Sequence, residues 1–259
     1  MQESEFRPLV KQFLNQFCFE VFDIPEKEKR KSPDFDVVGK SDRYTLELKI
    51  KGDDPVEIQN DENALIRGEL VSKTIPVGPR NTLAGILRDG VKQNIDHDPD
   101  RKTYHMIWVH SAGQDPNLLN SRFHATLYGT ETLFSIRKTN VITCYYFHNS
   151  AFFSWREFLD GVILSHNDQI QLCINTLSPR VDNFRKSQLT VAMANGLCDP
   201  DVLEARYDEL YITDCEIDRK NEKEVLEYLQ KKYGLDHLQT IPMNQHTGSV
   251  ALPTKNKKS

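Results

Sequence analysis

The sequence of 259 residues predicts an α/β fold in which a mixed central sheet is flanked by helices. Two observations support this class. In the first 150 residues, short strand patterns alternate with amphipathic helical patterns, as in sheets covered by helices. A compact β-hairpin pattern also lies near the N-terminus, between the first two helical patterns.

The chain opens with a predicted amphipathic helix, because apolar residues recur there at three- and four-residue spacing from Phe6 to Phe17. A charged loop follows at residues 25–32. The hairpin strands are expected at 34–39 and 44–50. Further elements of this half are expected as a short helix near 62–73, a helix at 81–94, a strand at 105–110, a helix around 118–133 and a strand at 141–147.

The second half has a different pattern. A β-hairpin is expected at residues 161–165 and 169–174, and a strand at 210–213. Asn221 and Glu224 fit a capping box for a helix that Gly234 ends. We therefore expect a core at 1–150 and a C-terminal α/β extension at 151–240, which either continues the core sheet or forms a small annex. Residues 241–259 are expected to be a disordered tail.

Composition excludes some classes of protein. With 38% hydrophobic and 27% charged residues, the chain is typical of a globular protein, and no apolar run approaches the roughly 18 residues of a membrane span. The acidic, polar start does not resemble a signal peptide. The five cysteines are scattered and never form C-x-x-C, which argues for reduced thiols and against both a disulfide framework and a zinc site. We expect a cytoplasmic protein without membrane partners.

The most informative stretch runs from Pro33-Asp34 to Glu47-Leu48-Lys49. Strand alternation places Glu47 and Lys49 on one face, and the hairpin brings the start of its first strand close to them. Asp34 and Asp36 share a face, so either is a candidate for the second acid. Two converging carboxylates need a cation between them, and hard oxygen ligands suit Mg²⁺ or Mn²⁺. Such an ion can activate water and neutralise a phosphoryl oxygen, while the lysine donates beside it.

These residues resemble the signature of the PD-(D/E)XK, or restriction-endonuclease-like, nuclease superfamily. The resemblance covers roughly residues 6–110. It implies a restriction-endonuclease-like core in which Asp34 and Glu47 hold the metal and Lys49 assists the water. It also implies a magnesium- or manganese-dependent hydrolase that cleaves phosphodiester bonds, more often in DNA than in RNA. A DNA endonuclease acting as a homodimer is the corresponding expectation. The net charge of -5 does not indicate nucleic-acid binding, but bound metals would supply positive charge locally.

Two further residues are candidates for this site. Glu20 lies seven residues after Phe13, which returns it nearly to the apolar face, so it is the candidate metal-binding acid of the opening helix. The alternative is that the helix ends earlier and that Glu20 is merely exposed. Gln93, on the helix after the hairpin, is a candidate contact for a phosphate or the metal-bound water; the alternative is a solvated helix face.

The bare pattern of acid, any residue, lysine is weak, because it recurs at 100–102 and 218–220. Only Glu47-Lys49 lies in a hairpin opened by Pro-Asp. The plain alternative is an exposed strand carrying solubilising charges. Two other functions also stay open: a catalytically inactive nucleic-acid-binding or assembly module with the nuclease fold, and a soluble interaction protein whose hairpin imitates the motif. No histidine spacing supports a zinc hydrolase.

Overall fold

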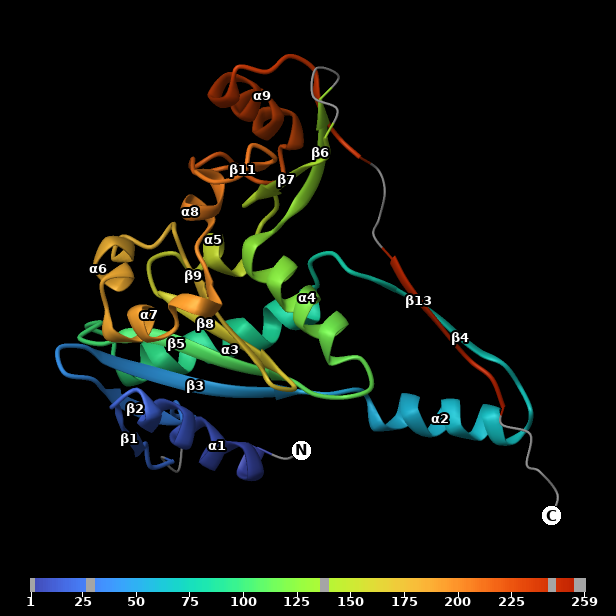
Figure 1. Ribbon diagram of the computed structural model, residues 1–259, viewed down its shortest axis with the longest axis horizontal. Coiled ribbons are helices and arrows are strands. Elements are labelled where there is room, and N and C mark those ends of the chain that lie inside the picture. The colour runs from blue at the N-terminus through green and yellow to red at the C-terminus, as the bar shows by residue number, and fades with distance from the viewer. Residues whose placement is uncertain (1–2, 27–30, 136–139, 242–245, 254–259) are drawn as a thin grey trace.

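A computed structural model describes residues 3–26, 31–135, 140–241 and 246–253. Its centre is a seven-stranded sheet in the order β1-β2-β3-β5-β8-β9-β10 (Figure 1). The strands are β1 (Glu20–Asp23), β2 (Phe35–Val38), β3 (Arg43–Lys51), β5 (Tyr104–Ser111), β8 (Gly161–His166), β9 (Gln169–Ile174) and β10 (Leu197–Cys198).

The sheet is mixed. β1, β2 and β3 form an antiparallel meander, β3, β5 and β8 run parallel, β9 returns antiparallel to β8, and β10 is parallel to β9. An α/β fold with a mixed sheet is therefore confirmed. The sheet continues well past residue 150, because strands from 161–198 complete it, whereas β11 and β12 lie in a second, smaller sheet; the second half of the chain thus contains both of the arrangements expected.

Helices cover both faces of the sheet. The helix α1 (Glu3–Gln16) buries Phe6, Val10 and Leu14 against one face, together with residues from α6 (Val181–Arg185) and α7 (Gln188–Ala192). The opposite face packs against α3 (Asn81–His97) and α4 (Pro116–Tyr128). None of the helices in the described ranges is both long and apolar enough to cross a membrane.

A smaller, four-stranded sheet stands beside the central one, in the order β11-β7-β6-β12. Its strands are β6 (Glu131–Ser135), β7 (Ile142–Tyr145), β11 (Leu210–Ile212) and β12 (Leu238–Thr240); the short helices α5 (Ala151–Ser154), η1 (Ala194–Gly196) and α8 (Pro200–Glu204) occur between them in the chain. The helix α9 (Glu222–Tyr233) packs on this sheet. The predicted capping box is confirmed: the backbone N–H of Glu224 donates to Asn221, whose amide donates back to the Glu224 carboxylate, and Gly234 ends the helix at φ +64°.

The helix expected at 118–133 is shorter than predicted. It ends at Tyr128, because Gly129 adopts a left-handed conformation (φ +57°) that closes the helix, and its N–H donates to the carbonyl of Ala125. The following residues form the strand β6 instead. A side chain at position 129 would collide with the carbonyl oxygen of His148, at 2.4 Å, so the turn requires glycine.

A narrow arm projects from the rest of the molecule (Figure 1). We define the arm as α2 (Pro55–Ile66), β4 (Val71–Pro76) and β13 (His246–Ala251), the two strands being paired antiparallel. Two predictions are wrong here. The helix lies earlier than 62–73, because Asp54 caps it and Pro55 occupies its first turn. Residues 246–251 form a strand rather than part of a disordered tail; residues 242–245 and 254–259 lie outside the described residues.

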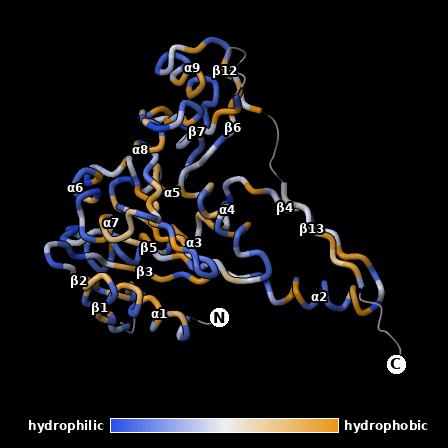
Figure 2. Tube along the Cα trace, viewed as in Figure 1, coloured by the Kyte–Doolittle hydropathy of each residue, from blue (hydrophilic) through white to orange (hydrophobic). Residues whose placement is uncertain are grey.

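The arm contains several apolar residues, which are coloured orange along the trace in Figure 2. No residue of α2 is buried. Large exposed hydrophobic residues of the arm and its ends are Val56, Ile66, Leu70, Val250 and Leu252. The rest of the fold therefore gives this element little packing.

Candidate active site

The β2–β3 hairpin determines which acid meets Glu47. Asp36 pairs with Thr45 across the two strands, so the residue opposite Glu47 is Asp34, at the point where β2 begins. The apolar partners of this hairpin face α1, whereas Glu47 faces α3. The alternation seen in the sequence therefore places the apolar residues of the hairpin on one face of the sheet and the candidate catalytic residue Glu47 on the other.

Asp34 is held by several donors. The backbone N–H of Leu48 donates to its Oδ2 at 2.8 Å, and the guanidinium of Arg7 donates to its Oδ1. Its own N–H donates to the carbonyl of Leu46 at 3.2 Å. With only 12% of its side chain exposed, this carboxylate has a fixed position directly beside the Glu47-Leu48-Lys49 segment.

Glu47 is 3% exposed, which is unusual for a carboxylate. Its Oε1 accepts a hydrogen bond from the ammonium of Lys49, but its Oε2 is buried and has no hydrogen-bond partner among the described residues. The pKa of Glu47 is raised to about 8, chiefly by burial; the charge of Lys49 lowers it and the charge of Asp34 raises it. Below this pKa the carboxyl group is protonated; once it ionises, its buried Oε2 has no donor among the described residues to compensate the charge.

Lys49 completes the cluster at its open side. Its side chain is 24% exposed, so its ammonium lies where the buried acids meet solvent. The structure thus brings together Asp34, Glu47 and Lys49, the three residues singled out in the sequence.

Arg7 is a member of this site that the sequence did not reveal. Its guanidinium lies 4.6 Å from the ring centre of Phe35 and contacts both Asp34 and Asp23, the latter at 3.0 Å. Lys11, one turn further along α1, also binds Asp23. The opening helix therefore presents a cation directly to the first acid of the motif.

The acid on α1 that interacts electrostatically with Asp34 is Glu3, whose side chain is 53% exposed and lies 3.8 Å from Arg7. Burial raises the pKa of Glu3, and the negative charge of Asp34 raises it further while Lys49 lowers it, so these groups share one electrostatic environment. The same periodicity could have identified it, because Glu3 lies three residues before Phe6 and seven before Val10.

The expectation for Glu20 is wrong. Cys18 adopts a left-handed conformation (φ +62°) after the last turn of α1, and the chain then enters β1. Glu20 is exposed and pairs with Val38, at the opposite end of the hairpin from Asp34. Four residues of strand separate Val38 from Asp34, or roughly 13 Å.

The two secondary candidates have different surroundings. Asp36 points to the end of α3, where its carboxylate lies 3.4 Å from Nε2 of His97, and it stands one strand repeat away from the site. Gln93 is buried (8% exposed), so it does not belong to a solvated helix face. Gly90, three residues earlier on α3, faces Cγ of Glu47: a Cβ there would lie 3.3 Å from that atom. Gln93 is on the helix that covers the site, one turn beyond this contact.

Comparisons of the chain with protein-family models, with curated proteins and with solved structures found no match. Its chemistry is therefore argued from the geometry alone. Two adjacent carboxylates, one with an unpaired buried oxygen, and a lysine at the solvent side can hold a hard divalent cation and donate a hydrogen bond next to it.

Proposed function

We propose that the chain is a divalent-metal-dependent nuclease of the PD-(D/E)XK type, which hydrolyses phosphodiester bonds in DNA. The observation that carries this proposal is the buried Oε2 of Glu47, which has no hydrogen-bond donor among the described residues. A hydrogen bond or a cation must compensate such an atom, and the nearest opposite charges are already bound to other oxygens.

The donor set fits Mg²⁺ or Mn²⁺. Both ions prefer carboxylate oxygens and keep open positions for water and phosphate, and neither needs the nitrogen or sulfur ligands that this site lacks among its described residues. Asp34 and Glu47 would hold the ion, with Glu3 contributing negative charge at the rim. A bound ion would supply charge neutralisation at the phosphate and lower the pKa of the attacking water.

The chain's own residues would do the remaining work. Lys49, held by Glu47 and partly open to solvent, can orient the attacking water or donate to a phosphoryl oxygen as negative charge develops there. Leu48 fixes Asp34 through its backbone N–H, which keeps the two acids converged. α3 excludes water from behind Glu47 because Gly90 lies directly against it.

The test is cleavage of supercoiled plasmid, single-stranded DNA and RNA with Mg²⁺, with Mn²⁺ and with chelator. D34N, E47Q and K49M should each lower cleavage by a factor of 10² or more, because each removes charge from the reacting centre. The matched control is the double variant D100N/K102M. Asp100 and Lys102 form the same acid-x-lysine pair at 3.1 Å, but both are exposed and outside the site. Equal loss in the control, or cleavage that persists with chelator, would overturn the proposal.

One contact favours the second candidate, a catalytically inactive nucleic-acid-binding module. Arg7 already provides a positive charge at Asp34, as a metal would in an enzyme. In that case DNA would bind without cleavage in either metal, and E47Q would leave binding unchanged. Measuring binding and cleavage on the same plasmid separates the two functions. A homodimer, which would offer two sites to a duplex, is part of the first proposal and is tested by sedimentation.

A further inference from the structure

A second cluster of chemically reactive side chains lies on the α4 face of the central sheet, near its β9–β10 edge. It consists of His124 on α4, Cys173 on β9 and Cys198 on β10. One ligand atom from each residue lies within 4.8 Å of the other two, and Nε2 of His124 is 3.5 Å from Sγ of Cys198. Cys173 and Cys198 are buried, whereas His124 is half-buried.

The cluster forms because strands that are far apart in the sequence pair with each other, so no local sequence motif predicts it. Cys173 and Cys198 are direct partners across the parallel β9–β10 ladder. The close approach of these strands depends on Gly196, where a Cβ would lie 2.6 Å from the carbonyl oxygen of Ile170. The scattered cysteines that argued against a zinc site in the sequence are therefore brought together by the fold.

The surrounding contacts hold the cluster in place. Asp199, directly after Cys198, is buried and accepts two hydrogen bonds from the guanidinium of Arg185, at 2.8 and 2.9 Å. Tyr128, one turn after His124, donates to the carbonyl of Cys198 at 3.1 Å. Both the helix and the short strand are thus fixed by side chains that are not ligands themselves, as metal sites require.

The distance between His124 and Cys198 matches one edge of a tetrahedral soft-metal site. With Zn–S near 2.3 Å and Zn–N near 2.0–2.1 Å, the nitrogen and sulfur ligands of tetrahedral zinc lie roughly 3.6 Å apart. The observed 3.5 Å between His124 and Cys198 agrees with this edge. Cys144, another buried cysteine, instead lies 3.4 Å from Oγ1 of Thr213 and 3.5 Å from a backbone carbonyl oxygen, as expected of a thiol that only fills the core.

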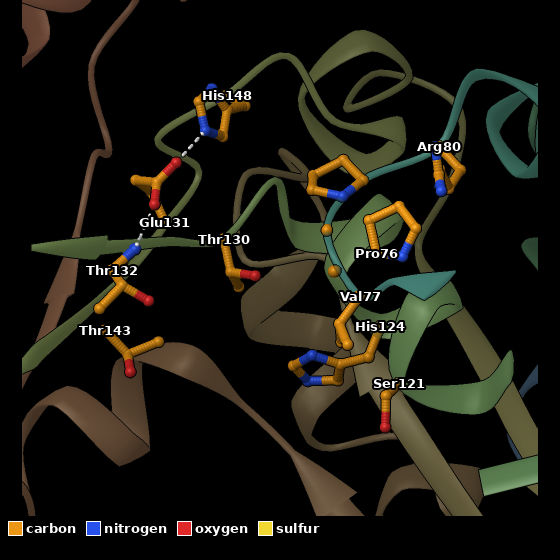
Figure 3. A pocket seen from close by; sticks show the side chains of 13 residues that line it. Pro76, Val77, Arg80, Ser121, His124, Thr130, Glu131, Thr132, Thr143 and His148 are labelled. Atoms are coloured by element: carbon orange, nitrogen blue, oxygen red, sulfur yellow. Dashed lines mark hydrogen bonds and ion pairs between the residues drawn. The ribbon is translucent and has the colours of Figure 1, made fainter. Parts of the chain in front are cut away.

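An entry route is also present. His124 lines a cavity of about 700 Å³ whose other wall residues include Arg80, Glu131 and His148 (Figure 3). Glu131 and His148 form a hydrogen bond with each other at 2.7 Å, so we do not count them as ligands of the cluster. An ion or its water ligand can reach the histidine from this cavity without opening the core.

We propose that His124, Cys173 and Cys198 bind one Zn²⁺ ion through Nε2 and two thiolates, with the fourth position taken by water. Binding would release the protons of both thiols to solvent, so affinity would rise with pH. No electron transfer is involved. This site is separate from the carboxylate site, because it uses none of the residues of the β2–β3 hairpin.

The test is metal stoichiometry on the reduced full-length protein, with Zn²⁺ removed and then restored. We expect one equivalent of zinc, and on Co²⁺ substitution the charge-transfer bands of thiolate ligands with the intense visible bands of tetrahedral cobalt. H124Q and C198S, each made in the E47Q background, should lose the bound equivalent or at least tenfold in affinity. C144S and E47Q should retain it; E47Q also ensures that zinc at the carboxylate site is not counted.

Replacing the buried Cys198 could impair folding. H124Q avoids this problem, because His124 is only half-buried and glutamine is similar to histidine in size. Circular dichroism of the variants provides the check on folding. The proposal would be overturned by a cobalt spectrum without thiolate bands, by zinc binding that survives C198S, or by a mass two hydrogens lower that shows Cys173 and Cys198 joined as a disulfide under reducing conditions.

Discussion

Gly90 and Glu47 are in direct contact across the α3–sheet interface: a methyl group at position 90 would lie 3.3 Å from Cγ of Glu47 and 3.0 Å from Cδ1 of Ile107. The absence of a side chain on this turn of α3 is what lets the helix close over the buried carboxylate. Packing at one helical position and the chemistry of the candidate site are therefore linked.

The first prediction compares two glycines of the same helix. In G85A the new Cβ meets only Arg88 Nη2 at 3.8 Å, so the variant should gain about 0.5–1 kcal/mol from reduced backbone freedom. G90A should instead lose about 1–3 kcal/mol through overpacking and should bind Mn²⁺ more weakly. Denaturant unfolding and manganese titration measure both effects. If the two variants behaved alike, the contact would have no role in positioning Glu47.

The second prediction concerns pH. The folded pKa of Glu47, about 8, lies above its usual value near 4.5. The contribution of Glu47 to the free energy of unfolding of the metal-free protein should therefore be fully present below pH 4.5. It should be lost as the pH rises to 8, and the loss should be at most roughly 5 kcal/mol. E47Q should flatten the dependence of Tm on pH between 5 and 8. Glu20→Gln, at an exposed strand position, is the control and should leave the curve unchanged.

The third prediction tests which acid of the N-terminal region belongs to the site. Glu3 is electrostatically coupled to Asp34, whereas Glu20 lies at the far end of the hairpin. E3Q should weaken Mn²⁺ binding several-fold, because it removes negative charge near the ion. E20Q should have no effect. The reverse order of affinities in a manganese titration would show that the start of α1 does not face the metal.

The fourth prediction concerns Arg7. R7M removes the cation beside Asp34, so Mn²⁺ should bind up to about tenfold more tightly, while the metal-free protein becomes less stable. K11M is the matched control, because Lys11 is a cation of the same helix that binds Asp23 rather than Asp34. Calorimetric titration and thermal unfolding report the two changes separately. Weaker manganese binding in R7M would mean that Arg7 supports the site rather than competing with the ion.

The hairpin was predictable because its information is local. Alternation from Tyr44 to Ile50 fixes which side chains share a face, so either Asp34 or Asp36 was expected near Glu47, and the register of the folded hairpin selects Asp34. The prediction for Glu20 was wrong because the information it needed is not periodic. The end of α1 depends on one left-handed residue, Cys18, whose conformation leaves no periodic signal.

The other features missed in the sequence depend on distant segments. The cluster around His124 requires the register of β9 and β10. The strand β13 requires β4 as its partner, which lies far away in the sequence. Hydrophobic periodicity reports which face of an element is buried, but it does not name the element that buries it. Arg7 was missed because its charge placed it on the polar side of α1, where the sheet edge supplies its acidic partners.

The arm has a consequence for the order of folding. Its strands join Pro76 to His246, 170 positions apart, and closing so long a loop in an unfolded chain costs roughly 4 to 5 kcal/mol. Once α3 and β12 are in place, only short connections separate the two strands from fixed points. The β4–β13 pair therefore forms only when residues 246–251 are available, and until then the apolar residues of β4 have no partner strand.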